Sequence, residues 1–391
     1  MVQRRKFLLG AVSVAGLAAC TPSRSSSTAA TVWEQPTAAP LRLTAPTGQI
    51  SPAGPVKVTV DGGRIESVTG LAGAVDADGV TWRSSGALAY DKTYKVTAHL
   101  LDSLGAKVEK AATFTTVKPR ALAAVTFQAN GMAALETGGT YGIGQPVIVA
   151  FSKAVKDRAA AEKAIKVETS PPVDGKFFWV DNKIVHWRPA KYWTKGTTVK
   201  VSVNTLGVNL GNGLYGKANA TTHFTIGRSL IAISDNSTHR TRVYIDGKLT
   251  RDMACSNGQG GYTTISNGDQ IHFWTQNGPH VVLSKERKHS MSSASYGLND
   301  PNNPFYYEPD DVQFCTRISY SGEFLHAAPW NNQLGRANTS HGCINLSTAD
   351  AQWVYKNFMV GDVVEVVHSP KDLPAWDGLG DWTVSYDKYG T

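Results

Sequence analysis

Two stretches of the chain repeat one another at a spacing of about one hundred residues. "TWRSSGALAYDKTYKVTAHL" and "HWRPAKYWTKGTTVKVSVNTL" each contain Trp-Arg, an aromatic residue, a turn lysine and then an alternating strand. The two tryptophans, Trp82 and Trp187, are 105 residues apart. Short alternating strands in a repeat of this length are typical of immunoglobulin-like β-sandwiches. The pattern predicts two tandem sandwiches, at residues 41–119 and 120–227.

The repeat ends at Arg228, and the strand pattern changes there. Short runs rich in Val, Ile, Phe and Tyr continue, beginning with two strands around a turn at Asp246-Gly247. A chain of 391 residues with 37 glycines suits two or three turn-rich domains. We therefore predict a third, β-rich domain at 228–370 and a C-terminal extension at 371–391. The expected fold class is mainly β.

One segment of the third domain, "LSTADAQWVYKNFMVG", has the pattern of a helix. Ser347 is the predicted N-cap, Asp350 the capping-box acid, and Gly361 lies just past the expected end. Cys343 would then lie in a turn just upstream of the helix. The helix dipole and the free backbone N–H groups there favour an anion.

The first forty residues are typical of an exported lipoprotein. Residues 1–19 combine a basic region with a short apolar run, which indicates a signal peptide. Leu17-Ala18-Ala19-Cys20 resembles a lipobox, which would make Cys20 the lipidated residue. The two arginines in "RRKFLL" leave twin-arginine and Sec export both open. Residues 20–40 are small, polar and proline-containing, as in a flexible tether.

The charge of the chain is moderately basic. The formal net charge is +8, and the three basic residues of the signal peptide account for part of it, leaving +5. This excess suits an anionic wall environment and equally an ordinary solvated surface. Because no basic stripe is interleaved with aromatic residues, we expect no nucleic-acid partner.

The segment "NTSHGCIN" places Cys343 two residues after His341, with a glycine between them. A thiol attacks carbonyl groups as a thiolate, so it needs a base or a lowered pKa. The candidate bases are His341 and His326, which lies seventeen residues upstream of the cysteine at the end of a predicted strand. A strand-end histidine that reaches a turn cysteine is the usual geometry of a Cys–His pair, which favours His326.

"HAAPW" followed by "SHGCIN" resembles the L,D-transpeptidase catalytic domain, the YkuD-type fold. Two immunoglobulin-like domains behind a lipoprotein signal resemble the mycobacterial members of that family. The resemblance implies that Cys343 is the acylated nucleophile and His326 the base, oriented by the backbone carbonyl of Ala327. The family often has serine at the latter position, so a hydroxyl contact is lost here while the carbonyl remains. The backbone N–H groups of Gly342 and Cys343 would form the oxyanion hole.

The resemblance also implies residues that contact the substrate. The segment 290–311 is similar to the family's active-site lid, and the substrate-contacting tyrosine falls at Tyr306 or Tyr307, of which we choose Tyr307. His341 is assigned to the catalytic site with Asn345 beside it, although the catalytic and structural roles of both stay open. Trp330 fits packing as well as substrate contact. The predicted substrate-binding residues are Ser340, Asn345, Trp330, Tyr296, Met291 and Tyr307.

Together with the export signal, the resemblance implies a lipid-anchored, extracytoplasmic peptidoglycan transpeptidase. It would release D-Ala from a tetrapeptide donor and join stem peptides by 3→3 crosslinks, with no cofactor and no metal. Carbapenems would be covalent ligands. The alternatives are a transpeptidase that attaches a protein to the wall and a non-catalytic wall-binding lipoprotein. Sortases need an arginine after the cysteine, and none follows Arg336; papain-like amidases place their histidine downstream of the cysteine.

Cys255 and Cys315 remain after lipidation and catalysis are assigned. An exported protein permits a disulfide between them. Nothing in the sequence places the two within bridging distance, so a disulfide and two buried thiols stay open.

Overall fold

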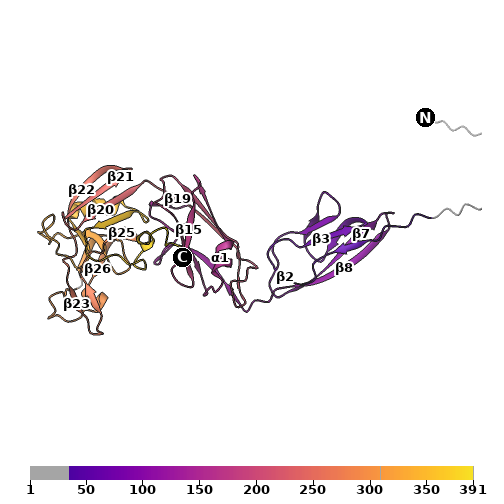
Figure 1. Cartoon of the computed structure of the whole chain (residues 1–391), viewed down its shortest axis with the longest axis horizontal. Helices are drawn as coiled ribbons and strands as arrows, with labels where there is room; N and C mark the ends of the chain where they lie inside the picture. The colour runs from indigo at the N-terminus through magenta and orange to yellow at the C-terminus, as the bar shows by residue number, and fades with distance from the viewer. Residues whose placement is uncertain (1–34, 309, 391) are drawn as a thin grey trace, which may run out of the picture.

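In the computed structural model, residues 35–308 and 310–390 are described. The predicted signal peptide, Cys20 and most of the predicted tether lie outside these residues. Figure 1 shows an elongated molecule in which the first sandwich stands apart, while the second packs directly against the C-terminal domain. The mainly β architecture, two β-sandwiches followed by a third β-rich domain, confirms the expected fold class.

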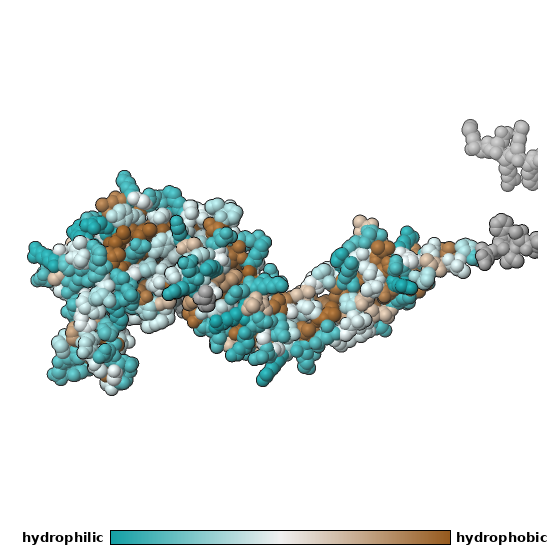
Figure 2. Space-filling model, in the orientation of Figure 1, coloured by the Kyte–Doolittle hydropathy of each residue, from teal (hydrophilic) through white to brown (hydrophobic). Residues whose placement is uncertain are grey.

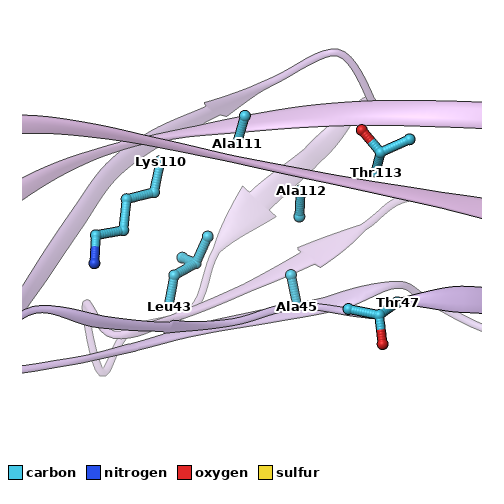
Figure 3. A pocket seen from close by; sticks show the side chains of 7 residues that line it. All are labelled: Leu43, Ala45, Thr47, Lys110, Ala111, Ala112 and Thr113. Carbon is cyan, nitrogen blue, oxygen red and sulfur yellow. The ribbon is translucent and has the colours of Figure 1, made fainter.

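The first sandwich consists of two four-stranded sheets packed face to face. One has the order β1 (Arg42–Thr44), β3 (Lys57–Asp61), β6 (Thr81–Ser84), β5 (Gly73–Val75), and the other β2 (Gly48–Ile50), β8 (Lys107–Thr116), β7 (Thr93–Asp102), β4 (Gly63–Thr69). Val58, Trp82, Leu100 and Phe114 fill the space between them. A surface opening in this domain is lined by residues of β1 and β8 and their neighbours (Figure 3): Leu43, Ala45, Thr47, Lys110, Ala111, Ala112 and Thr113.

The second sandwich has a five-stranded and a four-stranded sheet. The first has the order β11 (Ala133–Ala134), β10 (Val125–Asn130), β13 (Val147–Phe151), β16 (Ile184–Pro189), β15 (Gly175–Trp179), and the second β12 (Thr140–Tyr141), β19 (Ala220–Ile226), β17 (Thr198–Val203), β14 (Ile165–Ser170). A two-stranded pair, β18 (Leu214–Gly216) with β9 (Ala121–Ala123), and helix α1 (Arg158–Ala164) complete it. Tyr90 of the first sandwich joins the two, because its hydroxyl donates to the Gly216 carbonyl at 2.6 Å and accepts from the Gly207 N–H at 2.7 Å.

The sequence repeat corresponds to equivalent strands. Trp82 on β6 and Trp187 on β16 are both buried, and each covers a glycine on the paired strand. A Cβ at Gly73 or at Gly175 would lie 2.2 Å from the indole of Trp82 or Trp187, respectively. A glycine is therefore needed wherever the tryptophan lies flat across the neighbouring strand, which explains why the two features recur together.

The third domain is organised around a nine-stranded sheet. Its order is β25 (Gly278–Val281), β30 (Val363–Val367), β20 (Leu230–Asp235), β21 (Arg240–Ile245), β22 (Lys248–Ser256), β29 (Ile344–Leu346), β28 (Phe324–Ala327), β27 (Asp310–Arg317), β26 (Ser284–Met291). The predicted turn at Asp246-Gly247 joins β21 to β22, and both residues have positive φ, as a tight hairpin requires. A separate pair, β23 (Tyr262–Thr264) with β24 (Gln270–His272), and the short helix η1 (Ser293–Tyr296) lie outside the sheet. Figure 2 shows the projection that carries β23 as mostly hydrophilic.

Helix α2 (Thr348–Asn357) begins as predicted and ends earlier. The Ser347 hydroxyl accepts from the Asp350 N–H at 3.1 Å and donates to the Asp350 carboxylate at 2.7 Å. The helix ends at Asn357, four residues before Gly361, so this glycine is not the cap. Instead, Gly361 lies against Gly142 of the second sandwich, where a Cβ would meet the Gly142 nitrogen at 2.6 Å.

The second sandwich and the third domain share a close-packed boundary. The N–H of Gly142 donates to the Val360 carbonyl at 2.9 Å, and the N–H of Gly144 donates to the Gly361 carbonyl at 2.8 Å. Val363 of β30 belongs to the apolar core of the second sandwich. Backbone contact at this distance, together with a shared core, fixes the two domains relative to one another.

The C-terminal extension, including η2 (Gly380–Thr383), crosses back over the second sandwich. Asp381 is hydrogen-bonded to His186 at 2.9 Å and to the Tyr389 hydroxyl at 2.6 Å, and all three side chains are buried. The guanidinium of Arg188 lies 4.6 Å from the centre of the Trp382 ring and 4.2 Å from that of Tyr389. The extension is thus part of the domain boundary rather than a free tail.

Candidate active site

The strand register brings the predicted nucleophile and base to one surface of the sheet. Strands β28 and β29 are parallel, with Leu325 opposite Ile344 and His326 opposite Asn345. Because side chains alternate along a strand, Cys343, immediately before β29, shares a face with Asn345 and His326.

The Cys343 thiol is neutral in the resting site. Its sulfur donates to the backbone carbonyl of Gly322 at 3.6 Å. Burial raises the pKa of the thiol to about 12, although a hydrogen bond with the Phe324 backbone and the charge of Arg317 act in the opposite direction. The expected stabilisation by a helix N-terminus is absent, because β29 separates Cys343 from the start of α2 at Thr348.

His326 is held in the tautomer that a general base requires. Its Nδ1 lies 2.9 Å from the backbone carbonyl of Ala327. A carbonyl oxygen only accepts hydrogen bonds, so Nδ1 carries the proton and Nε2 has the free lone pair. Burial lowers the pKa of His326 to about 4, so the imidazole is neutral at physiological pH.

The turn before the thiol is fixed by its own hydrogen bonds. Gly342 has φ +128°, a conformation that side chains rarely adopt. The Ser340 hydroxyl accepts from the Gly342 N–H at 3.1 Å and donates to the Cys343 carbonyl at 2.5 Å, while the Thr275 hydroxyl donates to the Gly342 carbonyl at 2.7 Å. The Gly342 N–H, which we predict for the oxyanion hole, is therefore engaged by Ser340 in this state.

His341 is enclosed by aromatic rings. Its ring centre lies 5.0 Å from that of Tyr307, 5.2 Å from that of Phe273 and 6.2 Å from that of Phe305. Burial lowers the pKa of His341, and its Nε2 is buried without a hydrogen-bond partner. The contacts join the catalytic turn to the 290–311 segment.

Two tyrosines of that segment lie near the sulfur. The rings of Tyr296 and Tyr307 are 6.4 Å apart. Burial and then proximity to its neighbours, Cys343 included, raise the pKa of each phenol, that of Tyr307 to about 12. Tyr306 instead bonds the Glu308 carboxylate at the surface. The structure thus directs Tyr307 to the site, and not Tyr306.

Met291, Trp330 and Asn345 are distributed around the thiol. Met291 packs with Cys343 in a small apolar cluster. The indole of Trp330 is stacked 6.3 Å from the His326 ring and is 58% exposed, so it covers the base from the solvent side. Asn345 is buried, and its Oδ1 has no hydrogen-bond partner.

Cys255 and Cys315 are both free and buried, which decides between the alternatives left open by the sequence. The sheet order places β29 and β28 between their strands, β22 and β27. Cys315 lies in the same small apolar cluster as Cys343, and its thiol donates to the Val312 carbonyl at 3.4 Å.

Sequence reasoning missed a buried polar group beneath the thiol. The Glu323 carboxylate lies 2.9 Å from His280 Nε2 and accepts from the Gln276 N–H at 2.7 Å, and it raises the pKa of Cys343. His280 is 43 residues before Glu323 and belongs to no motif. The available signal was an acidic residue, Glu323, directly before the strand that carries His326.

Comparison with known proteins matches two family models. The Bacterial Ig domain model matches residues 47–209, and the L,D-transpeptidase catalytic domain model matches residues 229–366. Within residues 35–308 and 310–390, no helix is long and apolar enough to cross a membrane, and no cluster of three or more His, Cys, Asp or Glu is arranged to hold a metal ion.

Several proteins that are similar to this chain are named as L,D-transpeptidases. The chain is 39% identical over 344 residues to L,D-transpeptidase 2 of Mycobacterium tuberculosis strain CDC 1551 / Oshkosh, covering 86% of this chain and 79% of that protein. It is 34% identical over 353 residues to L,D-transpeptidase 5 of M. tuberculosis strain H37Rv, covering 87% and 73%. The solved structure of an LD transpeptidase in complex with imipenem has 32% identity and a TM-score of 0.50, covering 62% of this chain and 99% of that one.

Proposed function

This chain belongs to the L,D-transpeptidase family, and from that premise we propose that Cys343 forms an acyl-enzyme with a peptidoglycan stem peptide. The observation that carries the proposal is the arrangement of His326. Its Nδ1 is fixed on the Ala327 carbonyl, so Nε2 is left as a base on the face that holds the thiol. We propose the reaction class from this pair, together with the family.

The protonation states of the Cys343 thiol and the His326 imidazole determine how the attack proceeds. Both the thiol and the imidazole are neutral at rest, so the thiol proton moves to His326 Nε2 as the sulfur–carbon bond forms. Collapse of the tetrahedral intermediate breaks the carbon–nitrogen bond to the terminal D-Ala, whose amine receives the proton from His326. The side-chain amine of a second stem then attacks the thioester by the same route, which produces a 3→3 crosslink and restores the thiol.

The oxyanion of the intermediate would be stabilised by the N–H groups of Gly342 and Cys343. The Gly342 N–H donates to Ser340 in the resting site. An oxyanion that accepts from the Gly342 N–H would replace the Ser340 hydroxyl as its acceptor, while the hydroxyl keeps its own donor bond to the Cys343 carbonyl. Ser340 would therefore satisfy the N–H group until the substrate arrives.

The donor stem would lie between the 290–311 segment and Trp330. Tyr296, Tyr307 and Met291 contribute one side of this site, and the exposed indole of Trp330 contributes the other. The solved relative in complex with imipenem supports a β-lactam carbonyl occupying the position of the stem-peptide carbonyl. Carbapenems would then acylate Cys343 by ring opening.

The experiment is a transpeptidation assay with a tetrapeptide donor and an acceptor stem, analysed by mass spectrometry. We expect a 3→3 dimer and one equivalent of D-Ala from the wild type, and neither from Cys343→Ala with an unchanged melting temperature. Cys343 is half-buried and packs against a small apolar cluster only, so removal of its sulfur leaves no large core cavity. A dimer above background from the folded Cys343→Ala variant would overturn the assignment.

We also propose that Cys20 carries a lipid anchor outside the cytoplasm, with the tether and the two sandwiches as a spacer that places the third domain in the wall. The support is the Leu17-Ala18-Ala19-Cys20 segment. Several acyl chains give stable membrane attachment, where one does not. Cys20→Ser should release the protein from the membrane fraction or leave it unprocessed. Wild-type protein distributed equally into the detergent-free supernatant would argue against the anchor.

A further inference from the structure

A short loop next to the nucleophile links it to the rest of the molecule. Residues 318–323 join β27 to β28 and are closed by a bond from the Ile318 N–H to the Glu323 carbonyl at 2.9 Å. The Gly322 carbonyl of this loop accepts the Cys343 thiol. Where the loop lies therefore determines where the sulfur and its proton point.

The C-terminal extension holds this loop with a buried carboxylate. One oxygen of Asp377, which is 1% exposed, accepts from the Ser321 N–H at 2.8 Å, and the other accepts from the Gln276 side-chain amide at 2.7 Å. The next residue, Gly378, passes so close that an added Cβ would lie 3.2 Å from the Ile318 carbonyl oxygen. Asp377 thus fixes the backbone immediately before Gly322.

The second sandwich holds the same loop directly. The Tyr320 hydroxyl accepts from the Gly131 N–H, just after β10, at 2.6 Å. The Tyr320 ring packs in an apolar cluster with Ile148 of the sandwich and Leu379 of the extension. Three parts of the chain therefore meet at this loop: the second sandwich, the extension and the catalytic sheet.

The extension is itself anchored on the sandwich a few residues further along. Asp381 bonds His186 on β16, and Tyr389 bonds Asp381 while lying over Arg188 of the same strand. The backbone from Asp377 to Asp381 therefore connects the loop at Ser321 to β16 of the second sandwich. These residues couple the second sandwich to the active site only if their substitution changes the reactivity of Cys343.

We propose that Asp377 and Tyr320 are positioning residues, through which the second sandwich and the C-terminal extension hold the Gly322 carbonyl against the Cys343 thiol. The proposal rests on the proposed function, because the acylation rate reports on the reaction only if Cys343 is the nucleophile. The Gly322 carbonyl bonds the neutral thiol, so it orients the sulfur and at the same time disfavours the thiolate.

Loosening the loop should then change two observables in opposite directions. Acylation requires an aligned sulfur, so the imipenem acylation rate constant should fall about tenfold in Asp377→Ala and severalfold in Tyr320→Phe. Alkylation by iodoacetamide requires only thiolate, so its pH profile should move to lower pH in the same variants. The substitutions retain the other groups that act on the thiol charge, namely Arg317, Glu323, Cys315, Tyr296 and Tyr307. Glu323 belongs to the loop, so its carboxylate moves together with the Gly322 carbonyl.

The experiment uses the full chain at a temperature well below its melting temperature. Asp377→Asn serves as the conservative variant, because its amide oxygen can still accept from Ser321, and it should recover most of the acylation rate. Tyr192→Phe is the matched control: it removes a 3.0 Å bond between Tyr192 and Glu365 across the same domain boundary, away from the loop. The control should leave both observables at wild-type values.

The outcomes separate the proposal from a purely structural role. Lower melting temperatures for Tyr320→Phe or Asp377→Ala, with an unchanged acylation rate and an unchanged alkylation profile, would overturn it. Equal effects in Tyr192→Phe would also overturn it, because any damage to the boundary would then suffice. If Asp377→Ala does not fold, Tyr320→Phe, which keeps the ring, decides. Wild-type protein that imipenem does not acylate would count against the proposed function, while the alkylation profiles would still test the loop.

Discussion

Alkylation of Cys343 by iodoacetamide between pH 6 and 10 should show a thiol that is neutral at rest. Burial raises the pKa of the Cys343 thiol to about 12, and burial lowers the pKa of its partner His326 to about 4. A thiolate–imidazolium pair requires the opposite order of the two pKa values. The structure therefore predicts that no reactive ion pair exists before substrate binds.

The magnitude follows from the thiolate fraction. At pH 8 a thiol with a pKa of about 12 is ionised to about one part in ten thousand, whereas an ordinary cysteine with a pKa of about 8.5 is about one quarter ionised. A more basic thiolate is intrinsically more nucleophilic, which recovers roughly 1.5 orders of magnitude. We therefore expect alkylation of Cys343 to be roughly 50- to 100-fold slower than that of a free cysteine peptide at pH 8.

The assay is a timed alkylation of the native chain, quenched and digested, in which the labelled peptide carrying Cys343 is quantified by mass spectrometry. The logarithm of the rate should rise by about one per pH unit up to pH 10, without a plateau. The free cysteine peptide in the same tube supplies the reference. A rate that is flat between pH 6 and 8 and comparable to the reference would show a preformed ion pair and refute the reasoning.

Two substitutions and one labelling experiment test the catalytic base, the domain boundary and the two buried cysteines. His326→Ala should reduce acylation by imipenem about 100-fold or more, and more than His341→Ala, because the Ala327 carbonyl fixes the tautomer of His326 on the face of the thiol, whereas His341 is packed among aromatic rings. Stopped-flow rates in the reverse order would exchange the two roles. Gly142→Ala should lower the free energy of unfolding by about 2 to 4 kcal/mol, because its Cβ would lie 2.1 Å from the Asp362 nitrogen. Urea titration measures this change, and a loss below about 0.5 kcal/mol would contradict the close-packed boundary. Cys255 and Cys315 should not react with a thiol reagent in the native state, and both should react after unfolding. Reductant should leave the melting temperature unchanged, whereas a native disulfide would appear as an intact mass two daltons lower.

The sequence was most informative where the physical requirement is local. Trp-Arg, an aromatic residue, a turn lysine and an alternating strand lie close together in the sequence, so the recurrence of this pattern around Trp82 and Trp187 indicates two tandem sandwiches. The Ser347 cap, with Asp350 three residues later, located the start of α2. These features are encoded within a few residues, so a pattern can reveal them.

The rest depends on contacts between distant segments. Gly361 was expected to end the helix, but it allows close approach to Gly142, more than 200 residues away. The predicted C-terminal extension gave no sign that Asp377 would reach the loop beside the thiol. The pKa of Cys343 was expected to be lowered by a helix, whereas burial in the folded chain raises it. No local pattern specifies such burial.

Intact-protein and peptide mass spectrometry after incubation with imipenem tests the central claim most directly. The β-lactam ring opens on attack and no atom is lost, so the account predicts one drug mass on the peptide that carries Cys343. The adduct should be absent in Cys343→Ala and slow to form in His326→Ala. No adduct on the folded wild-type chain, or an adduct on Cys255 or Cys315, would contradict the claim that Cys343 is the nucleophile.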